Sequence, residues 1–105
     1  MSLSKQILHQ LSDLETMLRS HQLWESDAPS QSQLASTQPF AIDSLTPTQW
    51  LQWIFIPKMR QAAQGEQLPT QLEIAPYFEQ ALTDEAYKVD LLIQVRRIDA
   101  IYRRL

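Results

Sequence analysis

The side chains in this sequence that could carry out chemistry are few and widely spaced. His9 and His21 lie twelve residues apart, and the chain contains no cysteine. A metal site needs ligands at short, regular spacings, and a thiolate nucleophile or thiolate ligand needs a cysteine. We therefore expect no metal ion and no cofactor.

His21 and Asp43 are the residues best suited to acid–base catalysis, yet each has a simpler role. His21 stands near Trp24 where the first predicted helix ends, and the helix macrodipole favours a histidine in a last turn. Asp43 can cap residues 44–46 as an Asx turn. Neither residue has a partner at a spacing that predicts proton transfer. The sequence therefore favours a protein without a catalytic site.

The sequence offers more residues for recognising a partner than for catalysis. Trp50 and Trp53 share a predicted helix face, where they could clamp a partner's side chain or stack on a base. We favour the alternative that they fill the core of a small bundle. Polar residues before Pro39 could recognise a ligand or satisfy their own turn, and the turn is favoured. The candidate partner surface comprises His21, Trp24, Ser36, Thr37, Gln38, Asp43, Trp50, Trp53, Lys58 and Arg60.

The charge balance argues against nucleic-acid binding through bulk charge. The net charge is −3, with 9 basic and 12 acidic residues. Proteins that bind phosphate backbones without sequence preference usually carry excess positive charge. A local basic patch could still bind RNA. Lys58 and Arg60, directly after Pro57, form a small one. Four arginines near the C-terminus form either an RNA phosphate patch or, as we favour, a solvated helix face. These four are Arg96, Arg97, Arg103 and Arg104.

Helical periodicity indicates the elements that must position these side chains. Residues 3–21 carry an apolar stripe at 4-4-3-4 spacing, and Ser2 or Ser4 can cap its start. A second helix should run to Gln64, because Thr46 and Gln49 are spaced for a capping box around Pro47. Gly65 should supply its left-handed C-cap.

Two further helices are expected in the C-terminal part of the chain. Pro76 can begin a short helix, and Thr83 or Asp84 should cap the last one. No segment alternates in the manner of a strand. The last helix has its apolar stripe at Leu91, Val95, Ile98, Tyr102 and Leu105.

Pro57 interrupts the second helix. It lacks the amide that would bond the carbonyl of Trp53. The apolar positions before Pro57 and those after it also lie on different arcs of the helix. Either the helix kinks at Pro57 or part of the run from Trp50 to Ile56 faces a second surface, and we favour the kink.

Residues 22–45 show no helical period and form an unusually long connection. We expect it to be ordered rather than disordered, because disordered segments lack large apolar anchors. The expected fold is all-α, a compact bundle of about four helices in a single domain over residues 1–105, with this loop between helices 1 and 2. The expected anchors of the loop are Trp24, Leu34, Phe40 and Ile42.

No apolar run approaches the roughly 18–20 residues that span a bilayer, and the N-terminus lacks the pattern of a signal peptide. We therefore expect a cytoplasmic protein that does not bind a membrane. Nothing in the sequence indicates its oligomeric state.

Several blocks of the chain resemble the YqcC-like family of small bacterial proteins. These blocks are LETMLRSHQLW (residues 14–24), STQPF (36–40), Asp43, TPTQWLQWIFIPKM (46–59), Leu68-Pro69 and APYFEQAL (75–82). The resemblance covers nearly the whole chain and is weakest in the last helix. It implies an all-α bundle of about four helices in the cytoplasm, with no assigned activity. It also implies an RNA-modification context, since genes of this family are often found beside one for a tRNA pseudouridine synthase.

Three functions follow, in order of preference. The first is a non-catalytic accessory module that binds a protein partner, which the family context suggests is a tRNA pseudouridine synthase. The second is direct binding of structured RNA through the arginines with Lys58 and Arg60, against which the acidic net charge counts. The third is an enzyme with an unrecognised carboxylate or histidine site.

Overall fold

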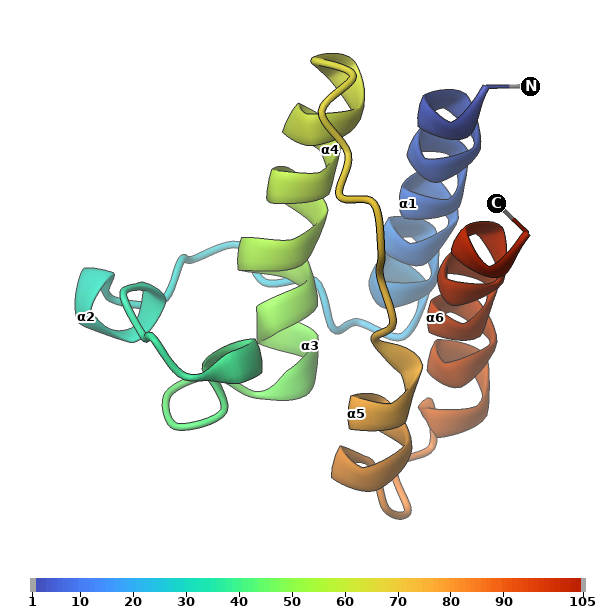
Figure 1. The fold of residues 1–105 in the computed structure, drawn as a ribbon. Coiled ribbons are helices and arrows are strands. Elements are labelled where there is room, and N and C mark those ends of the chain that lie inside the picture. The colour runs from blue at the N-terminus through green and yellow to red at the C-terminus, as the bar shows by residue number, and fades with distance from the viewer. Residues whose placement is uncertain (1, 105) are drawn as a thin grey trace.

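The first and last helices lie side by side and antiparallel in a computed structural model that describes residues 2–104 (Figure 1). Helix α1 (Leu3–Ser20) begins where the Ser2 hydroxyl accepts a 3.2 Å hydrogen bond from the Lys5 amide, as expected for an N-cap. Helix α6 (Lys88–Arg103) packs more extensively on α1 than any other element does. Their predicted stripes supply the centre of the core, at Ile7, Leu11, Leu14, Leu18, Leu91, Val95 and Ile98. Leu105 lies outside the described residues.

A continuous helical segment over residues 47–64 forms the third side of the bundle. It comprises α3 (Pro47–Trp50), the π-helical turn η2 (Leu51–Phe55) and α4 (Ile56–Gln64). The predicted capping box is confirmed, since the Thr46 hydroxyl accepts from the Gln49 amide at 3.2 Å and the Gln49 side chain accepts from the Thr46 amide at 2.9 Å. This segment packs on α1 through α4.

The π-turn explains the change of apolar direction that the sequence showed near Pro57. The Ile56 amide donates to the Leu51 carbonyl, five residues back instead of four. Such a turn holds one extra residue, so positions before it are rotated by about 100° relative to positions after it. Leu51 and Met59 consequently both face the core. The rotation thus occurs in the π-turn ahead of Pro57, while Trp53 and Ile54 face grooves outside the core.

The long connection is ordered by its own hydrogen bonds and contains two short elements, α2 (Gln31–Leu34) and the 3₁₀ turn η1 (Pro39–Ala41). Ser44 Oγ donates to the Gln33 carbonyl at 2.8 Å, and Gln33 Nε2 donates to the Ser44 carbonyl at 3.2 Å. Ile42 is 63% exposed, so its expected role as an anchor was wrong. The half-buried Phe40 packs against the core, and Ala41 is buried.

Two helix ends also differ from the expected ones. Gly65 has φ −88°, and the left-handed position at the end of α4 is taken by Glu66 with φ 56°. Helix α6 begins at Lys88, later than expected, and neither Thr83 nor Asp84 caps it. Both errors have one cause: several neighbouring residues could end or start each helix, and tertiary packing selects among them.

The short helix α5 (Ala75–Ala81) is started by a side chain from α6 rather than by a local cap. Asp99 accepts hydrogen bonds from the amides of Ile74, at 2.9 and 3.1 Å, and Ala75, at 2.8 Å. These are amides that a helix leaves without partners at its start. Within residues 2–104 every regular element is a helix and none is a strand, as predicted. No described helix combines the length and hydropathy needed to cross a bilayer.

Candidate functional site

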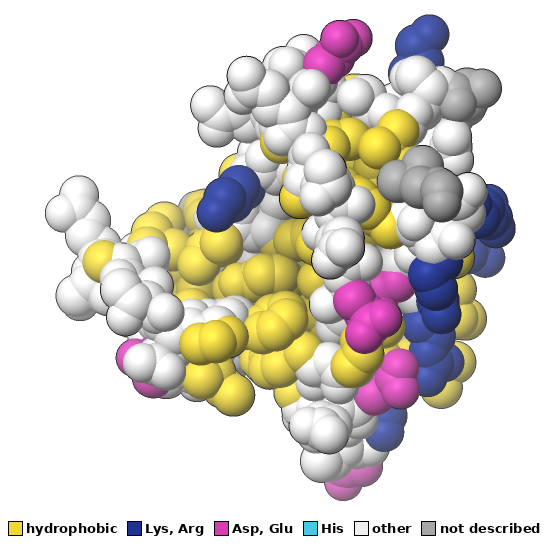
Figure 2. All heavy atoms as spheres, viewed as in Figure 1, with side chains coloured by type: hydrophobic (Ala, Val, Ile, Leu, Met, Phe, Trp, Pro, Cys, Tyr) yellow, Lys and Arg dark blue, Asp and Glu magenta, His cyan; other side chains and the backbone are white. Residues whose placement is uncertain are grey.

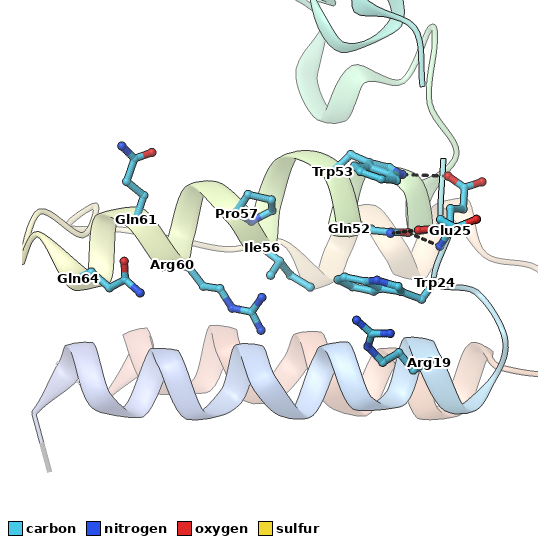
Figure 3. A pocket seen from close by; sticks show the side chains of 11 residues that line it. Arg19, Trp24, Glu25, Gln52, Trp53, Ile56, Pro57, Arg60, Gln61 and Gln64 are labelled. Atoms are coloured by element: carbon cyan, nitrogen blue, oxygen red, sulfur yellow. Dashed lines mark hydrogen bonds between the residues drawn. The ribbon is translucent and has the colours of Figure 1, made fainter. Parts of the chain in front are cut away.

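A cleft of about 840 Å³ lies between α1, the chain that follows it and the helix over residues 47–64 (Figure 3). Trp24 and Trp53 line it together with Ile56 and Pro57, and Arg60 reaches it from α4. We call it the tryptophan groove. It brings together three of the predicted partner-surface residues, Trp24, Trp53 and Arg60.

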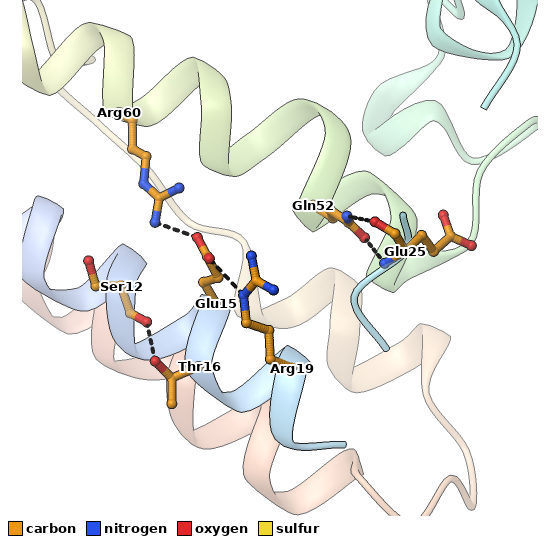
Figure 4. Close-up of polar contacts among 7 residues, drawn as sticks. All are labelled: Ser12, Glu15, Thr16, Arg19, Glu25, Gln52 and Arg60. Atoms are coloured by element: carbon orange, nitrogen blue, oxygen red, sulfur yellow. Dashed lines mark hydrogen bonds and ion pairs between the residues drawn. The ribbon is translucent and has the colours of Figure 1, made fainter. Parts of the chain in front are cut away.

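Glu25 is the centre of the hydrogen bonding in the tryptophan groove. Its carboxylate accepts from the Trp53 indole at 2.9 Å and from Gln49 Nε2 at 3.2 Å. Its backbone exchanges two bonds with the buried side chain of Gln52, at 2.8 and 2.7 Å (Figure 4). The Trp53 indole N–H therefore already has an acceptor within the protein, the Glu25 carboxylate. Glu25 and Gln52 could not be singled out from the sequence, since they are 27 residues apart.

The two arginines of the tryptophan groove share one carboxylate. Glu15 accepts from Arg60 Nη2 at 2.7 Å and from Arg19 Nε at 2.9 Å (Figure 4). Burial raises the pKa of Glu15, but the hydrogen bonds and charges of Arg60 and Arg19 outweigh it and hold the pKa below its usual value. Arg19 also lies 4.7 Å from the centre of the Trp24 ring, a cation–π contact. The arginines therefore stabilise the packing of α1 on α4.

A second groove, of about 620 Å³, opens on the face between η1, the helix over residues 47–64 and the connection to α5. Phe40, Trp50, Ile54 and Ile74 are among its mostly apolar lining, and we call it the aromatic groove. Figure 2 shows a continuous apolar surface on this face. Trp50 and Lys58 are the two predicted partner-surface residues found here.

A cluster of stacked rings supports one end of the aromatic groove. The centre of the Phe40 ring lies 4.1 Å from that of Tyr77, nearly parallel to it, and 4.7 Å from that of Trp50. Trp50 in turn stacks on Phe55 at 5.1 Å. Phe40, Trp50 and Tyr77 are only half-buried, so Trp50 contributes to both the core and the surface.

The remaining predicted residues lie outside both grooves. His21 Nε2 is 2.8 Å from Asp90 Oδ2, which joins the end of α1 to the start of α6. Asp43 accepts a 2.5 Å hydrogen bond from Ser36 Oγ, which in turn accepts from the Gln38 amide at 3.1 Å. The amides of Ser44 and Leu45 donate to the Ala41 carbonyl and that of Thr46 donates to Gln49, so the expected Asx turn from Asp43 to residues 44–46 is wrong. Thr37 is exposed.

Figure 2 shows basic side chains along the edge of the molecule where α6 lies. Arg96 lies 3.6 Å from Glu79. Burial raises the pKa of Asp99, and the nearby charge of Arg103 offsets part of that rise. Among residues 2–104, no cluster of three or more histidine, aspartate or glutamate side chains is arranged to hold a metal ion.

Comparison with known proteins identifies the family. The DUF446 family model, described as tRNA pseudouridine synthase C, matches residues 6–101. The chain belongs to this family. The uncharacterized protein YqcC of Escherichia coli K12 is 42% identical over 95 residues, covering 89% of this chain and 87% of that protein. The solution NMR structure of protein YqcC from E. coli superposes with a TM-score of 0.86 at 38% identity, covering 97% of this chain and 89% of that chain.

A second relative differs in size. The tRNA pseudouridine synthase C of Pectobacterium carotovorum is 36% identical over 66 residues. The match covers 63% of this chain but only 18% of that protein. The resemblance to the YqcC-like family and the all-α fold are thus confirmed, and one relative carries a similar segment within a much longer chain.

Proposed function

We propose that this protein is a non-catalytic accessory module that binds a tRNA pseudouridine synthase. One observation carries the proposal: a segment similar to this chain makes up 18% of a protein named tRNA pseudouridine synthase C. Covalent linkage keeps two modules at high effective concentration. Where the two modules are separate chains, a binding interface between them would provide the same proximity.

The surface of the molecule suits a protein partner. The aromatic groove is apolar and half-exposed, and exposed apolar surface of this kind is typical of protein interfaces. Its aromatic lining belongs to the residue types that dominate binding energy at such interfaces.

The other two functions have less support. The acid–base pair of His21 and Asp90 lies outside both grooves and has an exposed carboxylate, which leaves it without a site for substrate. For RNA binding, the net charge of −3 is unfavourable, and Arg19, Arg60 and Arg96 already face carboxylates.

The test uses the purified full chain and the tRNA pseudouridine synthase encoded in the same genome. Isothermal titration should give a saturable complex that survives nuclease treatment and depends only weakly on salt, because apolar contacts are not screened. Loss of the complex after nuclease treatment, with a steep salt dependence, would show RNA binding in place of protein binding. Absence of any complex with the synthase would refute the proposal.

A further inference from the structure

We propose that the aromatic groove is the docking surface, and that it receives an apolar segment of the synthase that carries a carboxylate facing Lys58. This inference rests on the proposed function and adds the surface and the chemistry of the occupant. It is carried by the shape of the groove, the backbone at Phe40 and the charges that line it.

The groove has walls of different kinds. One is the helix over residues 47–64, which contributes Trp50, Ile54 and Lys58. The extra residue of the π-turn brings Trp50 and Lys58, eight positions apart, to nearly the same face of this helix. The other is the extended connection before α5, which contributes Pro69 and Leu72. A volume of about 620 Å³ exceeds that of a single side chain and suits a short segment with several apolar groups.

Phe40 closes one end of this groove in an unfavourable backbone conformation. Its φ and ψ are 57° and 16°, and Ala41 also has a positive φ of 49°. Residues other than glycine seldom adopt this region, and such conformations persist only where surrounding contacts enforce them. Here the enforcing contacts are the stacked rings of Tyr77 and Trp50. The ring contacts thus hold the backbone of Phe40 in this conformation, with its ring at the groove.

The charges indicate what the occupant must carry. Lys58 lines the groove, is exposed, and takes part in no hydrogen bond or ion pair within residues 2–104. By contrast, Arg19 and Arg60 of the tryptophan groove already share Glu15. Lys58 is therefore the lining cation that is available to a partner's carboxylate, while the apolar walls bind the adjacent side chains. Glu73 lines the groove from the connection and disfavours an occupant that is acidic throughout.

The tryptophan groove is a weaker choice for docking because its polar groups bind one another. Glu25 engages Trp53, Gln49 and Gln52. A partner entering there would have to replace bonds that hold the end of α1 to the central helix.

The three tryptophans provide a test in which binding is measured on the wild-type protein. Trp50 lines the aromatic groove, while Trp24 and Trp53 line the tryptophan groove. In ¹⁵N-labelled protein each indole gives one resonance, assigned with single Trp→Phe variants. Adding the synthase should shift or broaden the Trp50 indole resonance and leave that of Trp24 in place. A response from Trp24 and Trp53, with Trp50 unchanged, would overturn the proposal in favour of the other groove.

Charge reversal tests the carboxylate. Lys58→Glu should weaken synthase binding about tenfold or more, and Ile54→Ala should weaken it as well. The matched control is Arg97→Glu, which makes the same charge change on α6 outside the groove and should stay within about twofold of wild type. Urea unfolding confirms that each variant folds. A lysine in place of one acidic residue of the synthase should restore binding to Lys58→Glu.

The possible failures are distinct. If wild type binds the synthase and Lys58→Glu binds equally well, the docking surface is wrong and the proposed function stands. If wild type does not bind, the function itself is wrong. If the protein alone forms a dimer that Lys58→Glu dissociates, the groove receives a second copy of this chain instead of the synthase.

Discussion

Asp99 is a carboxylate buried to 3% exposure that connects two helices. Burial raises its pKa, as does the nearby charge of Glu73, and the hydrogen bonds from Ile74 and Ala75 offset only part of that rise. Asp99 was not singled out in the sequence, because a polar residue beside an apolar stripe is ordinary in an amphipathic helix. Its acceptor role was not predictable, because the amides it binds are 24 and 25 residues away.

Replacing Asp99 with alanine should destabilise the fold by about 2–4 kcal/mol, since two buried amides would lose their acceptor. Asp99→Asn keeps an acceptor oxygen and removes the buried charge, so it should cost clearly less. Urea unfolding at neutral pH compares the two. Equal losses for both variants would mean that the hydrogen bonds to α5 contribute little.

The same carboxylate gives a pH dependence of defined sign. Because the pKa of Asp99 is raised by folding, its favourable contribution is complete below the unfolded value near 3.8 and is lost as pH rises through the folded pKa. The free energy of unfolding of wild type minus that of Asp99→Asn should therefore be larger at low pH than at neutral pH. The pKa of Glu15 is lowered, so Glu15 gives stability the opposite pH dependence. This contribution is the same in both proteins and cancels in the difference. A difference that grows with pH would contradict a raised pKa.

Tyr102 presents the opposite case, a polar atom without a partner. Its hydroxyl is buried and makes no hydrogen bond to residues 2–104. Burying an unpaired hydroxyl costs free energy. Tyr102→Phe should therefore leave stability unchanged or raise it by about 1 kcal/mol in a thermal or urea melt. A loss of more than about 1 kcal/mol would indicate that the hydroxyl has a partner in solution.

At the scale of elements, the features decided within a few residues were predictable. The Thr46–Gln49 capping box and the stripes of α1 and α6 involve side chains three or four positions apart, and they are confirmed within residues 2–104. In the sequence the π-turn was indicated only by the apolar positions before and after Pro57, which lie on different arcs of a regular helix. Its form depends on which face α1 covers, and that is a property of the tertiary packing.

Pro57→Ala tests whether packing or proline maintains the π-turn. In an ordinary helix interior the change would stabilise by about 3 kcal/mol. Here an α-helical register would rotate Leu51 out of the core and Trp53 away from Glu25. The variant should therefore keep its tryptophan fluorescence spectrum and change the free energy of unfolding by less than about 1 kcal/mol. A gain near 3 kcal/mol with an altered spectrum would show that Pro57 alone imposes the turn.

At the scale of the molecule, the bundle and its central core followed from periodicity, but the grooves did not. The sequence singled out Trp24, Trp53 and Arg60, and also Trp50 and Lys58. It did not show that the first three line one groove and the last two another, because that depends on which side of the central helix each faces. The exposed surface of Phe40 and Trp50 depends in turn on how residues 22–45 return to the bundle. Such information is absent from any short window of sequence.

Leu11 and Ile98 occupy the centre of the main helix contact, and neither is exposed to solvent. Leu11→Ala and Ile98→Ala should each reduce the free energy of unfolding by about 2–4 kcal/mol through lost burial and a residual cavity. Urea melts at neutral pH measure the change. Losses below about 1 kcal/mol at both positions would mean that α1 and α6 do not form the main interface.

The pairing of α1 with α6 also bears on how the protein is made. A ribosome releases α1 early, but α6, its most extensive packing partner, begins only at Lys88, far along the chain. Contacts between such distant segments form only after the intervening chain is available and its loop is closed. During synthesis the apolar face of α1 therefore lacks its main packing partner and is exposed to chaperones. Folding is completed only when the last helix has been made, so a nascent chain that stalls before α6 can bury only the part of that face that packs on α4.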